Sequence, residues 1–195
     1  MRGERRAFAD QLYADSHGHD ADQPDRLARW RNVEPETAEL LGVLVRGLRA
    51  RRILEIGTSN GYSAIWLGDA AQATGGNVVT LEVLPERAAL AGQHLRAAGV
   101  ADTVEVRTED AAAALSGFAD GAFDLIFLDA ERPFYVSYWP NLVRVLRPRG
   151  LLVVDNCLSH AKELVEFSEL VYSAAGVTST LVTVGAGVLL IVKSG

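Results

Sequence analysis

Five acidic side chains lie at or near the ends of five short apolar runs in this chain. They are Glu55, Glu82, Asp110, Asp129 and Asp155. One acid in such a position often only caps a helix, but five together favour a binding site. In open parallel sheets, ligands bind beyond the carboxyl ends of the strands, and those ends share one edge. The sequence therefore predicts an acid-rich site at that edge.

A glycine loop follows the first apolar run. Gly57 and Gly61 bracket three residues before the next predicted helix. Glycine allows positive φ and a close approach of a ligand to the backbone, and the N-terminus of the helix offers free N–H groups to a carboxylate or a phosphate. Glu82 comes about twenty residues later, where an acid can accept both hydroxyls of a ribose. The alternative is an ordinary turn capped by Ser59 or Asn60, but the combination favours an adenosine cofactor.

The spacing of the loop helps to choose the cofactor. A dinucleotide site usually has three glycines, and the third is missing here. A pyrophosphate would be repelled by Glu55, Asp110 and Asp129, whereas a sulfonium cation would be attracted, so we expect S-adenosylmethionine. A nicotinamide-dependent oxidoreductase is disfavoured by this spacing and by the lack of a Tyr-x-x-x-Lys pair. The predicted cofactor-binding residues are Glu55, Gly57, Thr58, Ser59, Gly61, Tyr62, Ser63, Glu82, Val83, Asp110, Ala111 and Asp129.

Two carboxylates and an amide also form a candidate metal site. Asp129, Asp155 and Asn156 follow two strands that we expect to be neighbours. Oxygen ligands of this kind suit Mg²⁺, Mn²⁺ or Ca²⁺. Such a cation could chelate two hydroxyls of an acceptor and lower the pKa of one. The alternative is that these side chains only cap loops and a helix. The lone Cys157 is expected to be buried filler.

These motifs resemble those of the catechol and caffeoyl-CoA O-methyltransferases. The resemblance covers about residues 33–192 and is carried by residues 54–63, Glu82, residues 123–130 and residues 150–156. It implies methyl transfer from S-adenosylmethionine to a hydroxyl of a small, catechol-like aromatic acceptor. It also implies Mg²⁺ on Asp129, Asp155 and Asn156, ribose on Glu82, Ser63 at the methionine end and Asp110 beside the adenine.

Arg132 departs from that family, which usually has a lysine there that takes the hydroxyl proton. A guanidinium stays protonated and cannot be a general base, so we expect Arg132 to contact the substrate. Three explanations stay open: the metal alone acidifies the hydroxyl, a histidine takes the proton, or the acceptor carries an anion that Arg132 binds. His160 is the candidate catalytic histidine, with His17 and His19 as alternatives. An ion pair of Arg132 with Glu131 or another acid is the plainer interpretation.

The predicted elements place these residues in one α/β domain. We expect a Rossmann-like, doubly wound sheet of seven strands, mostly parallel, with an antiparallel C-terminal hairpin and helices on both faces. The strands are expected at 52–56, 78–83, 104–107, 123–129, 151–155, 180–184 and 188–193. The helices are expected at 35–48, 62–73, 86–98, 111–115, 135–146 and 161–175. Residues 33–195 would form the methyltransferase domain, preceded by a polar segment of a short helix and a loop over residues 1–32.

The aromatic residues of the helix at 135–146 lie directly after Arg132. Tyr135, Tyr138 and Trp139 could line an acceptor pocket or belong to the core. The N-terminal segment is short for the family, whose members use this region to cover the acceptor. A more open pocket, or one closed by a partner subunit, is therefore expected.

Composition limits the classes of partner. The 195 residues carry a net charge of −6, which argues against nucleic acid as the main partner. One cysteine, no apolar run of membrane-spanning length and no signal peptide favour a cytoplasmic protein without a membrane partner. A small-molecule acceptor and a homodimer are the expected partners. A metal-independent methyltransferase acting on another oxygen, a nitrogen or a carboxylate stays open, as does a non-catalytic cofactor-binding protein.

Overall fold

The computed structural model describes residue 1, residues 3–26 and residues 28–195. Arg2 and Leu27, both in the N-terminal segment 1–32, lie outside the described residues. The helices are α1 (Gly3–Asp22), α2 (Pro35–Leu48), α3 (Tyr62–Thr74), α4 (Pro85–Ala97), α5 (Ala111–Gly117), α6 (Tyr135–Val145) and α7 (Val165–Ser173), with 3₁₀ turns η1 (Arg26–Ala28), η2 (Arg132–Phe134) and η3 (Ala161–Glu163).

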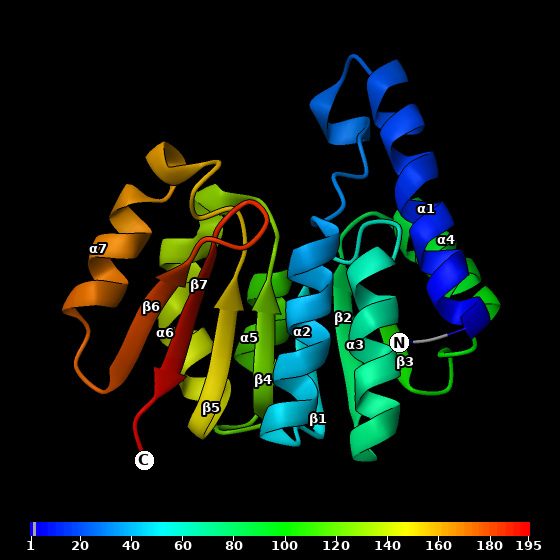
Figure 1. The fold of residues 1–195 in the computed structure, drawn as a ribbon. Helices are drawn as coiled ribbons and strands as arrows, with labels where there is room; N and C mark the ends of the chain where they lie inside the picture. Colours follow the sequence, from blue (N-terminus) through cyan, green and yellow to red (C-terminus); the bar gives the residue numbers. More distant parts are fainter. Residues whose placement is uncertain (2) are drawn as a thin grey trace.

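Seven strands of the described chain form a single sheet. Its order is β3-β2-β1-β4-β5-β7-β6 (Figure 1). Neighbours among β1 to β5 run parallel, while β7 is antiparallel to both β5 and β6. This confirms the predicted doubly wound sheet with a C-terminal hairpin. The strands are β1 (Arg52–Ile56), β2 (Asn77–Glu82), β3 (Val104–Thr108), β4 (Phe123–Leu128), β5 (Leu146–Val154), β6 (Val177–Val182) and β7 (Val188–Lys193).

The side chains of the central strands alternate between two apolar cores. Ile53 and Phe127 belong to the core that α2, α3 and the end of α4 share with one face of the sheet. Leu54 and Leu128 belong to the core that α5, α6 and α7 share with the other face. Because successive residues of a strand point to opposite faces, short runs that are apolar at every position require helices on both sides.

Helix α1 differs from the short helix expected in residues 1–32. It spans 20 residues, of which Ala9, Leu12 and Ser16 are buried. Arg5 attaches it to the rest of the molecule, donating to the carbonyl of Ala98 at 2.7 Å and to Asp69 at 2.6 Å. A helix that is held by polar contacts has little apolar periodicity in its sequence. The sequence therefore indicates a shorter helix than the 20 residues observed. No helix in the described residues is long and apolar enough to span a membrane.

Three boundaries near the C-terminus also differ from expectation. Strand β5 begins at Leu146, so Pro148 lies within the strand and not in a loop. A register shift in its pairing with β4 lies between Phe123 and Leu125. The helix expected at 161–175 is divided into η3 and α7, and β6 begins three residues earlier, at Val177.

The switch point of the sheet lies between β1 and β4. From β1 the chain continues through α3 to β2 on one side, and β4 pairs with β1 on the other. The connections therefore leave the two strands in opposite directions, which opens a crevice at their carboxyl ends. The backbone N–H of Asp129 donates to the carbonyl of Ile56 at 3.0 Å and closes the floor of this crevice.

Candidate active site

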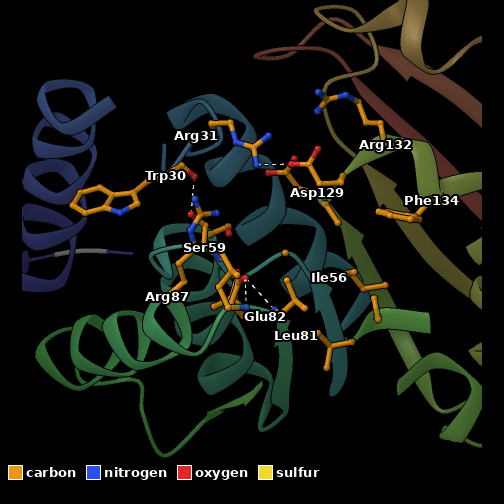
Figure 2. Close-up of a pocket in the computed structure, with 18 of the residues that line it drawn as sticks. Trp30, Arg31, Ile56, Ser59, Leu81, Glu82, Arg87, Asp129, Arg132 and Phe134 are labelled. Atoms are coloured by element: carbon orange, nitrogen blue, oxygen red, sulfur yellow. Dashed lines mark hydrogen bonds and ion pairs between the residues drawn. The ribbon is translucent and has the colours of Figure 1, made fainter. Parts of the chain in front are cut away.

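A cavity of about 680 Å³ lies at the carboxyl ends of the parallel strands (Figure 2). Its walls come from the loops after β1 to β5 and from Arg26 and residues 29–33, which we call the strap. Figure 2 shows Ser59, Glu82 and Arg87 toward one end, and Arg31, Asp129 and Arg132 toward the other. The predicted convergence of strand-end residues therefore produces one cavity with two chemically different ends.

The glycine loop forms the floor between the two ends. Gly57 has φ of 103°, and a Cβ built there would collide with the backbone carbonyl of Asp129. The N–H groups of Gly57 and Thr58 donate to the carbonyl of Leu81 at 3.1 and 3.2 Å. Glycine is required at position 57 because both the left-handed backbone and the close approach of two strand ends exclude a side chain.

Glu82 lies at the first end, with its carboxylate held by backbone groups. Its Oε2 accepts the N–H of Ser59 at 2.8 Å, and its Oε1 accepts those of Val83 and Leu84 at 3.0 and 3.1 Å. The side chain lines the cavity although it is buried. A carboxylate has about four acceptor sites, so the fixed carboxylate keeps capacity for hydroxyls of a ligand.

Glu55 lies beneath the cavity and does not line it. Thr80 donates to its Oε2 at 2.5 Å, and its Oε1 has no hydrogen-bond partner among the residues that the structure describes. Burial raises the pKa of this carboxyl to about 7, opposed by interactions with Ser63 and Thr80. Ser63 itself lines the cavity. Glu55 is therefore placed to act on a ligand through Ser63 and through its charge.

Asp129, Asp155 and Asn156 come together at the second end, as the sequence predicted. The strand ends are adjacent because Leu128 pairs with Val154, and the Asn156 amide nitrogen lies 2.8 Å from Asp129 Oδ1. Asp129 and Asn156 line the cavity, whereas Asp155 is buried behind them. The described residues contain no group of three or more His, Cys, Asp and Glu side chains placed for a metal. The third member of this set is the amide of Asn156.

The two aspartates repel each other. Burial first, and the charge of Asp129 second, raise the pKa of Asp155 to about 8. Burial also raises the pKa of Asp129 to about 6, while the charges of Arg31 and Arg132 oppose that rise. Asp155 Oδ1 has no hydrogen-bond partner in the described part of the chain. Nearby arginines therefore offset part of the effect of burial on Asp129, whereas no cation of the described residues offsets it for Asp155.

Cys157 is not available as a ligand. It is buried, and its Sγ lies 3.5 Å from the carbonyl of Val154. Burial raises the pKa of the thiol to about 12, so it stays protonated at neutral pH.

Arg132 forms an ion pair with Glu163 and not with Glu131. Its Nε donates to Glu163 Oε2 at 2.7 Å, and the side chain is only 4% exposed. Glu131 instead pairs with two arginines of the strap, Arg31 at 2.6 Å and Arg26 at 3.3 Å. Arg132 therefore has a structural role through its ion pair with Glu163. Because it also lines the cavity, it is able to contact a ligand.

The strap is held in place from α1. Asp20 accepts the backbone N–H groups of Trp30 at 2.7 Å and Arg31 at 2.9 Å. His19 stacks on Trp30 with ring centroids 3.8 Å apart, and His17 packs edge-on against Tyr13. Neither histidine lines the cavity, whereas Trp30 does. His19 therefore supports the strap, and neither histidine lines the cavity that holds the acidic end.

The remaining predicted residues divide between the cavity and the core. His160, Tyr138, Val83, Asp110 and Ala111 line the cavity. Burial and the charge of Arg132 lower the pKa of His160. Besides Glu55, Asp155, His17 and His19, the predicted residues that do not line it are Gly61, Tyr62, Tyr135 and Trp139, of which the three aromatic side chains lie in the apolar cores.

Sequence reasoning missed the arginines of the cavity wall. Arg26, Arg29 and Arg31 come from the strap and Arg87 from α4, and all four line the cavity. The signal was present as three arginines within six residues of the N-terminal segment, 26–31. These arginines alone do not predict a place in the cavity, because the segment has no apolar pattern that would locate it near the strand ends.

Comparisons with known proteins agree with this architecture. A family model described as O-methyltransferase matches residues 26–194. A catechol O-methyltransferase from Mycobacterium tuberculosis is 41% identical over 139 residues, which are 71% of this chain and 61% of that protein. One from Niastella koreensis is 37% identical over 140 residues, covering 70% of this chain and 63% of that protein. The chain thus spans about three fifths of the length of these relatives.

A solved structure has the same fold over almost the whole chain. It is an O-methyltransferase from Bacillus cereus in complex with SAH, S-adenosylhomocysteine. It is 27% identical, superposes with a TM-score of 0.80, and the match covers 96% of this chain and 91% of that one.

Proposed function

Because the chain belongs to the O-methyltransferase family, we propose that it transfers a methyl group from S-adenosylmethionine to a hydroxyl of a small, catechol-like aromatic acceptor with the help of a divalent cation. The single observation that carries this proposal is the cavity with two ends. Glu82 and the glycine loop at one end suit an adenosine group, and Asp129 with Asp155 and Asn156 at the other suit a cation and a hydroxyl.

The cofactor end would work through fixed acceptors and an open backbone. Glu82 is held by three backbone N–H groups and can accept hydroxyls of the ribose without reorganising. The glycine at position 57 keeps the loop close to the backbone of Asp129, and Ser63 faces the cavity where the methionine end would lie. Glu55 and Asp129 add negative charge near this floor, which favours a sulfonium over a phosphate. S-adenosylmethionine supplies the electrophilic methyl group.

The acidic trio fits a divalent cation. Asp155 Oδ1 is buried without a hydrogen-bond partner among the described atoms, and burial raises the pKa values of both aspartates. As placed, Asn156 turns its amide nitrogen toward Asp129, and a half-turn of the amide would present its oxygen there. A bound Mg²⁺, Mn²⁺ or Ca²⁺ would lower the pKa of a chelated hydroxyl and hold that oxygen toward the methyl group.

Proton transfer does not require a lysine in this arrangement. The acceptor oxygen gains the methyl carbon as the carbon–sulfur bond breaks, and the hydroxyl proton leaves to water or to a base. Arg132 cannot accept it. His160 lines the cavity, and because its pKa is lowered it is neutral at pH 7 and able to accept a proton.

Chelation tests the proposal. Labelled S-adenosylmethionine and catechol should yield methylated catechol with Mg²⁺, and EDTA should abolish the product. A metal-independent methyltransferase is the second candidate, because Arg31 and Arg132 already place positive charge near Asp129. Activity that survives EDTA would support this second candidate and refute the first. No transfer to any hydroxyl, amine or carboxylate acceptor, with or without metal, would refute both.

The assembly that we propose is a cytoplasmic homodimer. Leu181 on the edge strand β6 and Val192 on β7 are about two fifths exposed, at 37% and 41%. An exposed apolar edge is a common site of association. Light scattering should give twice the chain mass, and a monomer at micromolar concentration would contradict the dimer.

A further inference from the structure

The acceptor end of the cavity carries more positive charge than the proposed reaction needs. Arg26, Arg31 and Arg132 line it, while Glu131 and Glu163 are the two carboxylates that pair with them. Three guanidinium groups therefore face two carboxylates at this rim. On the proposed function, on which this inference rests, Asp129 and Asp155 are occupied by a cation and do not neutralise the third.

The guanidinium of Arg132 has more N–H donors than its ion pair with Glu163 uses. Its Nε donates to Glu163 at 2.7 Å, and its two terminal nitrogens are not among the buried side-chain atoms that the described residues leave without a partner. The side chain is nine-tenths or more buried, with 4% exposed, and its head reaches the cavity. Because a guanidinium carries five N–H donors and that of Arg132 lines the cavity, the N–H groups beyond Nε can serve an acceptor group on a ligand.

Arg31 approaches the same volume from the strap. It donates to Glu131 through one terminal nitrogen at 2.6 Å, and its Nε is buried with no partner among described residues. Its backbone has φ of 52°, a left-handed conformation that the hydrogen bond to Asp20 stabilises. The chain thus maintains an unfavourable backbone conformation while holding this side chain over Asp129, as Figure 2 shows.

The arginines converge on one place. Arg31 pairs with Glu131, the residue next to Arg132 in the chain, and both arginines line the same cavity beside Asp129 and His160. Arg31 and Arg132 come from segments 101 residues apart in sequence, so the convergence is a property of the fold.

We propose that the acceptor carries a carboxylate, which Arg31 and Arg132 bind while its hydroxyls face Asp129. A guanidinium matches a carboxylate in geometry and charge, and these two arginines already bind carboxylates of the protein. Neutral catechols lack this contact, so the pair sets specificity and does not take part in the chemistry.

The test compares 3,4-dihydroxybenzoate with its uncharged amide, 3,4-dihydroxybenzamide. Calorimetry of the complex with S-adenosylhomocysteine and Mg²⁺ should show tighter binding of the benzoate by about tenfold to a hundredfold, the range expected for charge-assisted hydrogen bonds. Arg132→Gln should reduce this ratio to near one. Arg31→Gln, at a one-third exposed side chain, should lower it severalfold and serves where the first variant does not fold.

Arg96→Gln is the matched control, because Arg96 is exposed on α4 and outside the cavity. It should leave the ratio unchanged. Equal binding of benzoate and amide by the wild-type protein would overturn the inference, and so would a ratio that survives in both cavity variants. Methylation is scored separately: arginine-dependent binding of the benzoate without methyl transfer would support the carboxylate site and count against the proposed function.

Discussion

The hydroxyl of Ser59 in the glycine loop donates a hydrogen bond of 2.7 Å to the backbone carbonyl of Trp30 in the strap. The backbone N–H of Ser59 binds Glu82, and Asp20 binds the N–H groups of Trp30 and Arg31. The proposed ribose-binding carboxylate, the glycine loop and the strap are therefore one connected set. The conformation of the strap should therefore depend on its contact with Ser59 and on its contacts with Asp20.

Removing the carboxylate of Asp20 should loosen the strap. In Asp20→Ala, two backbone N–H groups lose their acceptor, at about 1–3 kcal/mol each where they stay buried, and Arg31 loses the bond that stabilises its left-handed backbone. Hydrogen exchange of residues 30–31 should accelerate, and affinity for S-adenosylhomocysteine should fall by a few-fold. Asp22→Ala, at an exposed position of the same helix, is the control. Equal exchange in the two variants would contradict the role of Asp20.

Glu82 should dominate affinity for the adenosine cofactor. Glu82→Gln keeps the size of the side chain but replaces a charged acceptor of hydroxyl hydrogen bonds by a neutral one and introduces a donor beside backbone N–H groups. We expect the dissociation constant for S-adenosylhomocysteine to rise about tenfold to a hundredfold, measured by calorimetry. Glu86→Gln, exposed at the start of α4, should leave it unchanged. An unaltered constant in Glu82→Gln would show that the ribose binds elsewhere.

The sheet and the convergence of its strand-end acids followed from local pattern. Short apolar runs predict strands buried on both faces, and parallel strands end at one edge, so Glu82, Asp129 and Asn156 had to meet around one crevice. No knowledge of distant contacts was needed. Tyr62 follows Gly61, which suggests a place beside the cavity, but the first turn of α3 directs its ring into the core, 5.4 Å from the ring of Tyr13.

The strap could not be placed from sequence. Its contacts are between distant residues, such as Arg31 with Glu131, 100 positions apart, and Arg87 with the carbonyl of Arg29, 58 apart. Polar contacts of this kind leave no periodicity. The partner of Arg132 was missed for the same reason, since Glu163 lies 31 positions away on η3, beyond the reach of any local pattern.

A side chain at position 57 should unfold the site. Gly57→Ala adds a Cβ that overlaps the carbonyl of Asp129 and requires φ near 103° of an alanine. We expect a loss of several kcal/mol of stability, measured by urea denaturation. Gly47→Ala is the opposite case, because Gly47 lies within α2 with no atom near the added methyl, and it should gain about 0.5–1 kcal/mol. Equal effects of the two changes would contradict the described loop.

The buried pair of Asp129 and Asp155 should make stability depend on pH and on divalent cations. Burial, and then the charge of Asp129, raise the pKa of Asp155 in the folded protein to about 8 from an ordinary value of 3.8. The folded state therefore holds this proton more tightly than the unfolded chain does. The resulting stability is fully present below the ordinary pKa and is lost as pH rises through about 8.

Without a divalent cation, the melting temperature should therefore fall between pH 6 and pH 9, by on the order of 5 °C. Mg²⁺ should reverse this fall at pH 9, where both carboxylates are ionised, and have little effect at pH 5, where Asp155 keeps its proton. Asp155→Asn removes the charge, so it should raise the melting temperature of the metal-free protein at pH 9 and abolish the response to Mg²⁺. Asp102→Asn, exposed after α4, should retain the response. If Asp155→Asn instead lowers the melting temperature at pH 9 and still responds to Mg²⁺, then the repulsion between the two aspartates is not what the cation relieves.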